Sequence, residues 1–456
     1  MKKIQTSLLL REPTLVLIFS FACTIVIGTG LLMLPISTKA GTIDFLDALF
    51  TATSATCVTG LMTLDAGTIF SRFGQTVIMI LMQIGGLGIM TFSTIIIFLL
   101  GKQISFKEKW MVQDSFSSSH GSNVFQLVKR VLILSFGIEI IGLFLLFYSF
   151  SDTMDFGQAS FYALFHTISG FCNAGITLFP DSLMSYKDDV FINMTFAVLI
   201  IVGSLGFLVI AELGNRLSRE KNARRINLTF HTRVILAFST ALIVLTTLMF
   251  FLMEQKHTLE NEPFLNQLLI SFFQAVTKTA GFVTIDFSQM AESSVFMYIN
   301  LMFIGAAPGS VGGGIKVTAF AVLVALTIAK LKNQEEVVLF KSTIDSVTVA
   351  KTVSVIIISS VIIGVFFMLV LVSETYELTD IESKAMFVKL LFESISAFGT
   401  VGLSLGATAD LSGLGKFLII LLMFIGRLGP LTVALAVSLK ERKQLFSYSE
   451  EKLMVG

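Results

Sequence analysis

The stretch ALFTATSATCVTGL, residues 48–61, is rich in Thr, Ser and Gly although it lies between two strongly apolar segments. A related stretch, ALFHTISGFCNAGI, occupies residues 163–176. Two further copies end in TAGF at Phe282 and in TVGL at Leu403. The spacing between copies far exceeds the 20–50 residues of solenoid repeats, so the pattern predicts four larger units. The copies align on Gly60, Gly175, Gly281 and Gly402.

Two further side chains recur at fixed distances before three of the aligned glycines. A phenylalanine stands ten residues before the glycine, at Phe50, Phe165 and Phe392, and a serine stands six residues before it, at Ser54, Ser169 and Ser396. The third copy differs, because Phe272 stands only nine residues before Gly281 and Lys278 lies in the turn. This difference indicates a one-residue deletion and puts the geometry of the third turn in doubt.

The composition identifies an integral membrane protein. Hydrophobic residues make up 54% of the chain, charged residues only 14%, and the mean hydropathy is +0.86, far from the balance of a soluble domain. A net charge of +1 gives no basic field for nucleic acid. The three cysteines form no CxxC pair and no histidines have metal-ligand spacing, so we expect no disulfide framework, zinc site or covalent cofactor.

Eight apolar stretches are long enough to cross a ~30 Å hydrocarbon layer, which needs about 20 residues. They cover residues 13–37, 73–100, 124–150, 190–213, 228–253, 294–330, 349–373 and 413–439. Shorter, half-apolar segments near 43–56, 158–171, 264–278 and 386–398 separate the members of each pair. The sequence therefore predicts an all-α membrane protein. Eight transmembrane helices and four re-entrant pore helices would form four tandem span–pore-loop–span repeats around one central ion pore.

The expected repeats divide the chain into residues 1–102, 103–217, 218–341 and 342–456. The basic start followed by an apolar run could be mistaken for a secretion signal, but the run from Pro13 to Pro35 is longer than a signal's apolar region. We therefore interpret it as a retained first span. Basic residues predominate in the termini and between repeats, and acidic residues on the hairpin side, which predicts that both termini are cytoplasmic.

The hairpins have a composition suited to an ion filter. Non-helical backbone at membrane depth must be buried in protein or line a wet cavity. Rings of backbone carbonyls can replace the hydration shell of K⁺, and glycine reaches the positive φ that such turns need. The short helices would also direct the negative ends of their dipoles at the cavity. One hairpin could equally be a packing turn, but four at matching places favour a filter.

The sixth span contains a helix-breaking segment, FIGAAPGSVGGGIKVTAF, residues 303–320. Each interior Gly costs about 0.5–1 kcal/mol relative to Ala, and Pro about 3 kcal/mol, so the helix should break there. Broken helices occur where backbone lines a cavity or moves, which predicts an intramembrane gating loop over residues 304–315. A static kink is an alternative, whereas a phosphate loop lacks its GK[ST] ending and strand. The breaking residues are Gly305, Pro308, Gly309, Ser310, Gly312, Gly313 and Gly314.

Three charged residues lie deep within predicted spans. Arg427 lies in the middle of the eighth, where a charge costs at least ~2.5–3.5 kcal/mol and normally faces the interior or a partner. Lys316 directly follows the glycines of the sixth span, where gating and snorkelling roles both remain open. Glu139 in the third span is either a member of a buried pair or a packing oddity.

The chain resembles the Ktr/Trk/HKT superfamily of K⁺ transporters, most closely the KtrB-type pore subunits, from the first span to GRLGPLT at residues 426–432. In this superfamily Ser at the first filter glycine accompanies Na⁺ permeation, whereas Gly at all four positions, as here, accompanies K⁺ preference. The resemblance places a K⁺ filter at Val58, Thr59, Gly60, Asn173, Ala174, Gly175, Thr279, Ala280, Gly281, Thr400, Val401 and Gly402.

The resemblance also implies a mechanism and partners. The glycine-rich segment would gate the pore, and Arg427 would hold this loop by hydrogen-bonding its carbonyls and would repel cations. Channel-like potassium uptake across a bacterial plasma membrane, activation by Na⁺, a homodimer and a cytosolic KtrA-like RCK ring that binds ATP or ADP are all implied. Membrane lipids are the remaining expected partners, and nucleic acid is not one.

Two rival functions belong to other classes. A sodium or mixed monovalent-cation transporter working by alternating access would be expected to have inverted repeats, whereas here every unit has the same order. An intramembrane enzyme would need a nucleophile motif or HExxH near one of the four histidines, and the sequence has neither. We therefore expect a transport protein and not an enzyme.

Overall fold

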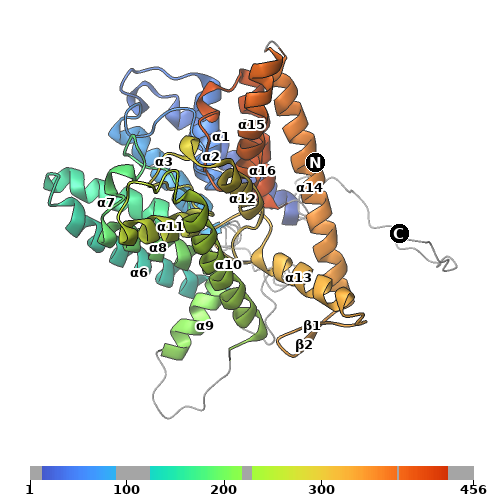
Figure 1. Cartoon of the computed structure of the whole chain (residues 1–456). Helices are drawn as coiled ribbons and strands as arrows, with labels where there is room; N and C mark the ends of the chain where they lie inside the picture. Colours follow the sequence, from blue (N-terminus) through green and yellow to red (C-terminus); the bar gives the residue numbers. More distant parts are fainter. Residues whose placement is uncertain (1–12, 89–123, 218–227, 377–378, 430–456) are drawn as a thin grey trace, which may run out of the picture.

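The computed structural model describes residues 13–88, 124–217, 228–376 and 379–429 (Figure 1). The predicted boundary between repeats at residues 102 and 103 lies outside these ranges. In the first half the helices are α1 (Pro13–Leu32), α2 (Phe45–Cys57), α3 (Arg72–Gly86), α6 (Val124–Phe150), α7 (Phe156–Phe171), α8 (Val190–Leu205) and α9 (Phe207–Leu217). In the second half they are α10 (Phe230–Glu254), α11 (Phe264–Thr277), α12 (Glu292–Phe303), α13 (Val317–Leu331), α14 (Ser346–Thr375), α15 (Asp380–Gly399) and α16 (Gly413–Leu428). Short 3₁₀ turns cover Pro35–Ser37, Met184–Tyr186, Phe287–Gln289 and Thr408–Asp410.

Helices α2, α7, α11 and α15 match the four short segments predicted between the spans. Three of them begin at a polar cap that accepts hydrogen bonds from the first free N–H groups. Asp44 caps α2, Asp155 caps α7, and Thr379 forms a reciprocal capping box with Glu382 at the start of α15. α11 starts after Pro263 without a side-chain cap. Each short helix ends three or four residues before its aligned glycine, so all four turns begin at a similar distance from it.

The short helices contact their neighbours in a cyclic order. Each packs against the longer helix that precedes it in the chain, α1, α6, α10 or α14. Each also packs against the helix that follows the neighbouring turn: α7 contacts α3, α11 contacts α8, α15 contacts α12, and α2 contacts α16. The last of these contacts joins the two ends of the described chain. The four turns are therefore held around a common centre.

Helices suited to a lipid environment surround this centre. Three helices, Val131–Phe150 within α6 together with α10 and α14, are long and apolar enough to cross a membrane, and the bent pair α8 and α9 meets the same test. Apolar side chains along α14 such as Ile357, Val361 and Val365 are more than half exposed, as expected of a surface that faces lipid. A multi-pass membrane protein follows. α3 and α16 border on residues outside the described ranges, so the count of eight spans stays a prediction.

Two features depart from the sequence-based expectation. The apolar run 190–213 predicts one continuous span, but the chain turns by 104° between α8 and α9, because Gly206 adopts φ +85°. A two-stranded hairpin, β1 (Val337–Leu339) with β2 (Ser342–Ile344), interrupts the all-α pattern. Phe340 and Lys341 both have positive φ, as in the tight turns that join antiparallel strands. Figure 1 shows the hairpin at the end of α14 remote from α15.

Candidate functional site

One cavity lies among the four predicted turns. Its volume is about 370 Å³, and its wall contains the aligned glycine of every copy. Residues one or two positions after the glycines also line it, including Met62, Ile176, Val283 and Leu403. The cavity therefore opens on the side of the chain segments that leave the turns. The structure brings together all four glycines that the sequence aligns, although these lie far apart in the chain.

The glycines alternate with backbone carbonyls in a closed circle. All four have positive φ, between 66° and 95°. A Cβ built on any of them would overlap the carbonyl oxygen of the residue that precedes the next copy's glycine. A side chain would therefore meet both backbone strain and a collision at every position. The pairs are Gly60 with Ala174, Gly175 with Ala280, Gly281 with Val401, and Gly402 with Thr59.

The serines six residues before the glycines hold the turns in place. Ser54 Oγ accepts a hydrogen bond from Gly60 N at 3.1 Å, and Ser396 Oγ accepts one from Gly402 N at the same distance. In the second copy Ser169 Oγ instead donates to the carbonyl of Ile176 at 2.7 Å. The recurring serine therefore ties each of these three short helices to the backbone at or just after the glycine.

The third turn has a different backbone path, as its shorter sequence predicts. In the other three copies the residue two before the glycine is left-handed, with φ of 55° at Val58, 59° at Asn173 and 49° at Thr400. Thr279 has no positive φ. Instead the carbonyl of Thr277 accepts both Ala280 N at 2.9 Å and Gly281 N at 3.2 Å. Gly281 nevertheless lines the cavity. The missing residue therefore changes the backbone path before the glycine and not the position of the glycine itself.

The glycine-rich segment 304–315 forms a closed loop between α12 and α13. Gly305 N donates to Ile315 O at 2.7 Å and closes its neck. Its predicted residues Gly305, Pro308, Gly309, Ser310, Gly312, Gly313 and Gly314 all lie between the end of α12 and the start of α13. They separate the two helices as expected.

The loop docks on the bend between α8 and α9. Ala307 N donates to Ser204 O at 3.0 Å, and Val311 N donates to Gly203 O at 3.2 Å. In return, Phe207 N donates to Gly309 O at 3.1 Å. Sequence reasoning missed this docking surface. Gly206, embedded in an apolar run, was its only local signal.

Three basic side chains hold backbone around the loop. Lys278 Nζ donates to Ile304 O at 2.9 Å and Lys316 Nζ to Gly312 O at 2.7 Å. The Arg427 guanidinium donates to the carbonyls of Val311 and Gly85. In the part of the chain that the structure describes, none of the three forms an ion pair with a carboxylate. All three side chains therefore bind backbone carbonyls and not carboxylates.

The loop also reaches the fourth turn directly. Gly313 N donates to the hydroxyl of Thr400 at 3.1 Å, and Thr400 precedes Gly402 in the predicted filter. Asn173, from the second turn, has its side-chain amide 2.5 Å from Ser204 Oγ at the α8–α9 bend. The turns and the loop thus share hydrogen bonds. Neither contact could be predicted, because each joins residues distant in the sequence.

Glu139, whose role the sequence leaves open, is a member of a buried polar pair. Both of its carboxylate oxygens accept from Gln83 Nε2, at 2.9 and 3.0 Å. The other end of the Gln83 amide accepts a weak hydrogen bond from Cys172 Sγ at 3.8 Å. Glu139 on α6 is thereby connected to the residue that ends α7, one position before the second turn.

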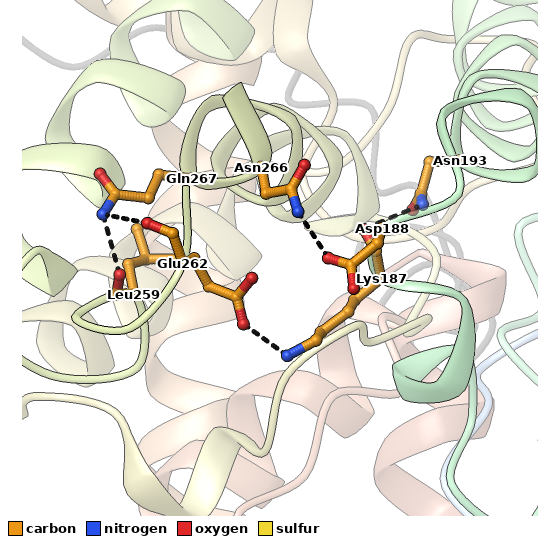
Figure 2. Close-up of polar contacts among 7 residues, drawn as sticks. All are labelled: Lys187, Asp188, Asn193, Leu259, Glu262, Asn266 and Gln267. Atoms are coloured by element: carbon orange, nitrogen blue, oxygen red, sulfur yellow. Dashed lines mark hydrogen bonds and ion pairs between the residues drawn. The ribbon is translucent and has the colours of Figure 1, made fainter. Parts of the chain in front are cut away.

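Polar side chains also link the second and third copies (Figure 2). Lys187 forms an ion pair with Glu262, and Asn266 Nδ2 donates to Asp188 Oδ1 at 2.8 Å. The hydrogen bond to Glu262 raises the pKa of Lys187 above its ordinary value of 10.5. The pair's contribution to stability is therefore complete below pH 10.5 and is lost as pH rises through the raised pKa.

An acidic side chain lies in the wall of the cavity itself. The Asp286 carboxylate accepts hydrogen bonds from the Ser288 hydroxyl at 2.7 Å, the Ser288 amide at 2.9 Å and Gln289 Nε2 at 3.0 Å. The Ser288 side chain is the main cause that lowers the pKa of Asp286. Asp286 therefore stays negatively charged at neutral pH, and its field favours cations near the cavity.

The fold and the site define a class: a helical multi-pass membrane protein built around one glycine-lined cavity. The chain belongs to the TrkH family of cation transport proteins, whose sequence profile matches residues 1–448. This confirms the resemblance to Ktr and Trk proteins that the hairpin motifs predict. The family is one of cation transport proteins.

Several relatives match over nearly their whole length. The Ktr system potassium uptake protein B of Bacillus subtilis is 40% identical, over 97% of this chain and 97% of that protein. The protein of the same name from Vibrio alginolyticus is 38% identical, over 98% and 95%. The potassium/sodium uptake protein NtpJ of Enterococcus hirae is 34% identical, over 98% and 97%.

A solved structure has the same fold. The crystal structure of the potassium transporter TrkH from Vibrio parahaemolyticus superposes with a TM-score of 0.74, over 96% of this chain and 86% of that one. The two sequences are only 19% identical, so the likeness extends to the fold alone.

Proposed function

We propose that this protein takes up potassium ions across the bacterial plasma membrane through a channel-like path. Four span–pore-loop–span repeats, with eight transmembrane helices, would surround the path. The cyclic arrangement of four glycines against four carbonyls around one cavity is the observation that carries the proposal. Relatives named as potassium uptake proteins, at 40% and 38% identity, support the choice of ion.

The filter works by replacing water with backbone oxygen. A dehydrated K⁺ is bound by rings of carbonyls, which the residues at and before the glycines supply. The donor set comprises Val58, Thr59, Asn173, Ala174, Thr279, Ala280, Thr400 and Val401 with the four glycines. The four short helices α2, α7, α11 and α15 end directly before this set or one residue earlier. The partial negative charge at their carboxyl ends stabilises a cation there.

The loop 304–315 closes the path beneath the filter. In the described conformation Arg427 and Lys316 hold its carbonyls. The positive charge of Arg427, which has no carboxylate partner among the described residues, adds an electrostatic barrier that is strong where the dielectric constant is low. To open, the loop must break its hydrogen bonds to the α8–α9 bend, to Thr400 and to Arg427 at the same time.

Control of the gate comes from outside this chain. We place both termini in the cytoplasm, where a homodimer of the chain would sit on a KtrA-like RCK ring that binds ATP or ADP. Na⁺ acts as activator and membrane lipids surround the dimer. The names of the B. subtilis and V. alginolyticus relatives, as one protein of a Ktr system, support a partner subunit.

Flux of ⁸⁶Rb⁺ into K⁺-loaded liposomes tests the proposal. Because the gate could keep the isolated chain closed, the wild type is compared with a variant lacking Gly312–Gly314. We expect passive Rb⁺ uptake that exceeds Na⁺ uptake and is larger in the deletion variant. A folded deletion variant without passive flux would contradict the proposal of a channel-like path. Flux with no preference for Rb⁺ over Na⁺ would favour a sodium or mixed-cation transporter instead.

A further inference from the structure

A buried carboxylate lies behind the fourth turn. Glu393, on α15, is fully buried. Its Oε1 accepts hydrogen bonds from Leu405 N at 3.1 Å and from Ser404 Oγ at 2.5 Å, and its Oε2 accepts from Thr408 Oγ1 at 2.6 Å. Glu393 stands nine residues before Gly402 and Leu405 stands three after it. One side chain thus joins the short helix before the glycine to the backbone that leaves it.

The second copy makes the same connection with a different residue. His166 stands nine residues before Gly175, and its Nε2 lies 3.2 Å from the N–H of Leu178, three residues after that glycine. Its Nδ1 lies 2.7 Å from the carbonyl oxygen of Tyr162. Since a carbonyl can only accept, Nδ1 carries the proton and Nε2 is the acceptor. His166 is also fully buried.

The other two copies show what happens without such an acceptor. In the first, the ninth residue before the glycine is Thr51, whose buried hydroxyl has no hydrogen-bond partner among the described residues. In the third, Gln274 stands only seven residues before Gly281, and its Nε2 donates to the hydroxyl of Thr284, three residues after that glycine, at 3.0 Å. Only the second and fourth copies bind the backbone N–H itself.

We propose that Glu393 and His166 are filter-positioning residues, which fix the direction of the turn carbonyls by accepting the N–H three residues after the glycine. The short helix fixes one end of each turn, and this hydrogen bond fixes the other. The glycine between them then has no freedom to rotate its carbonyl toward or away from the ion. This inference rests on the proposed filter, and it assigns the two residues a role in discrimination among alkali cations.

Paired substitutions separate the effect of the acceptor's position from the effect of its charge. Glu393→Gln keeps a side-chain oxygen at the same distance from the helix backbone and removes the charge. Glu393→Asp keeps the charge but shortens the side chain by one methylene, which moves the oxygen away from the N–H of Leu405. His166→Gln places an amide oxygen near the position of Nε2, whereas His166→Asn places that oxygen too far from the N–H of Leu178 to accept its hydrogen bond. These four changes are small enough to fold, which size-exclusion profiles in detergent would verify. Thr408→Val is the matched control, since it removes a donor to the same carboxylate and leaves the N–H of Leu405 bound.

The measured quantity is the ratio of ⁸⁶Rb⁺ to ²²Na⁺ flux in liposomes. We expect the two Gln variants and Thr408→Val to keep the wild-type ratio. The ratio should fall about fivefold in Glu393→Asp and His166→Asn, the equilibrium factor that corresponds to one ordinary hydrogen bond. An unchanged ratio in both short variants, or a loss in Glu393→Gln as large as that in Glu393→Asp, would overturn the positioning role.

A filter variant measured in parallel distinguishes this inference from the proposed function. If Gly60→Ser lowers the flux ratio while the short variants of Glu393 and His166 do not, only the positioning role fails. If Gly60→Ser also leaves the ratio unchanged, the proposed filter fails, and the positioning role fails with it.

Discussion

At the scale of single residues, the filter glycines are defined by two constraints at once. Gly60 has φ +95°, a conformation that costs other residues about 1–3 kcal/mol, and a Cβ there would overlap the carbonyl of Ala174. Gly41 also has positive φ, +77°, but a Cβ on it would meet nothing within 4 Å. The two glycines therefore share the strain and differ only in the collision with a filter carbonyl.

Gly60→Ser should lower the preference for K⁺ over Na⁺, because the new Cβ must displace the Ala174 carbonyl from its place in the circle. Competition of K⁺ and Na⁺ with ⁸⁶Rb⁺ uptake in liposomes measures this preference. Gly41→Ser is the control and should keep wild-type selectivity. Equal selectivity in both variants would remove Gly60 from the filter.

Arg427 provides a second prediction at this scale. Arg427→Gln removes a charge that has no carboxylate partner among the described residues and weakens the contacts to Val311 and Gly85. Basal ⁸⁶Rb⁺ flux without any partner protein should rise about tenfold or more, since removing ~1.4 kcal/mol from a barrier gives a factor of ten. The exposed Arg72 serves as control, and Arg72→Gln should leave the flux unchanged. A basal flux in Arg427→Gln equal to that of Arg72→Gln would contradict the barrier.

At the scale of elements, the sequence predicts what is local and misses what depends on distant partners. The short helices follow from the half-apolar segments between the longer apolar runs, and the altered third turn follows from one missing residue before Gly281. The bend at Gly206 was missed because a lone glycine in an apolar run is also compatible with a continuous helix. What distinguishes it is the loop 304–315, which supplies the hydrogen bonds that the bent backbone needs.

The bend at Gly206 yields a prediction about the gate. Gly206 combines φ +85° with a carbonyl, that of Pro308, 2.6 Å from where a Cβ would lie. Gly206→Ala should therefore push the loop from its seat and raise basal ⁸⁶Rb⁺ flux, with a loss of stability of about 1–3 kcal/mol. Gly137→Ala on α6 is the control, because a Cβ there would meet nothing within 4 Å. Lower stability without added flux would mean that the bend supports the fold but not the gate.

At the scale of the whole molecule, the circle of helices closes where α16 meets α2. An ion pair joins them, with Lys416 Nζ 2.7 Å from Asp47 Oδ1 and less than a fifth of either side chain exposed. The pair Lys187–Glu262 links the second and third copies in the same way, but its lysine is 40% exposed. The sequence predicts four units around an axis, yet it could not identify either pair, because hydropathy does not specify which ends meet.

Closure of the circle predicts an order of stabilities. Exposed ion pairs contribute about 0.2–1 kcal/mol, whereas loss of one partner from a more buried pair also leaves a charge without compensation. Lys416→Met should therefore lower the thermal midpoint in detergent more than Lys187→Met, and Asp47→Asn combined with Lys416→Met should recover part of the loss, because no charge is then left alone. A larger drop in Lys187→Met, or no recovery in the double variant, would show that contacts other than this ion pair hold the first and last copies together.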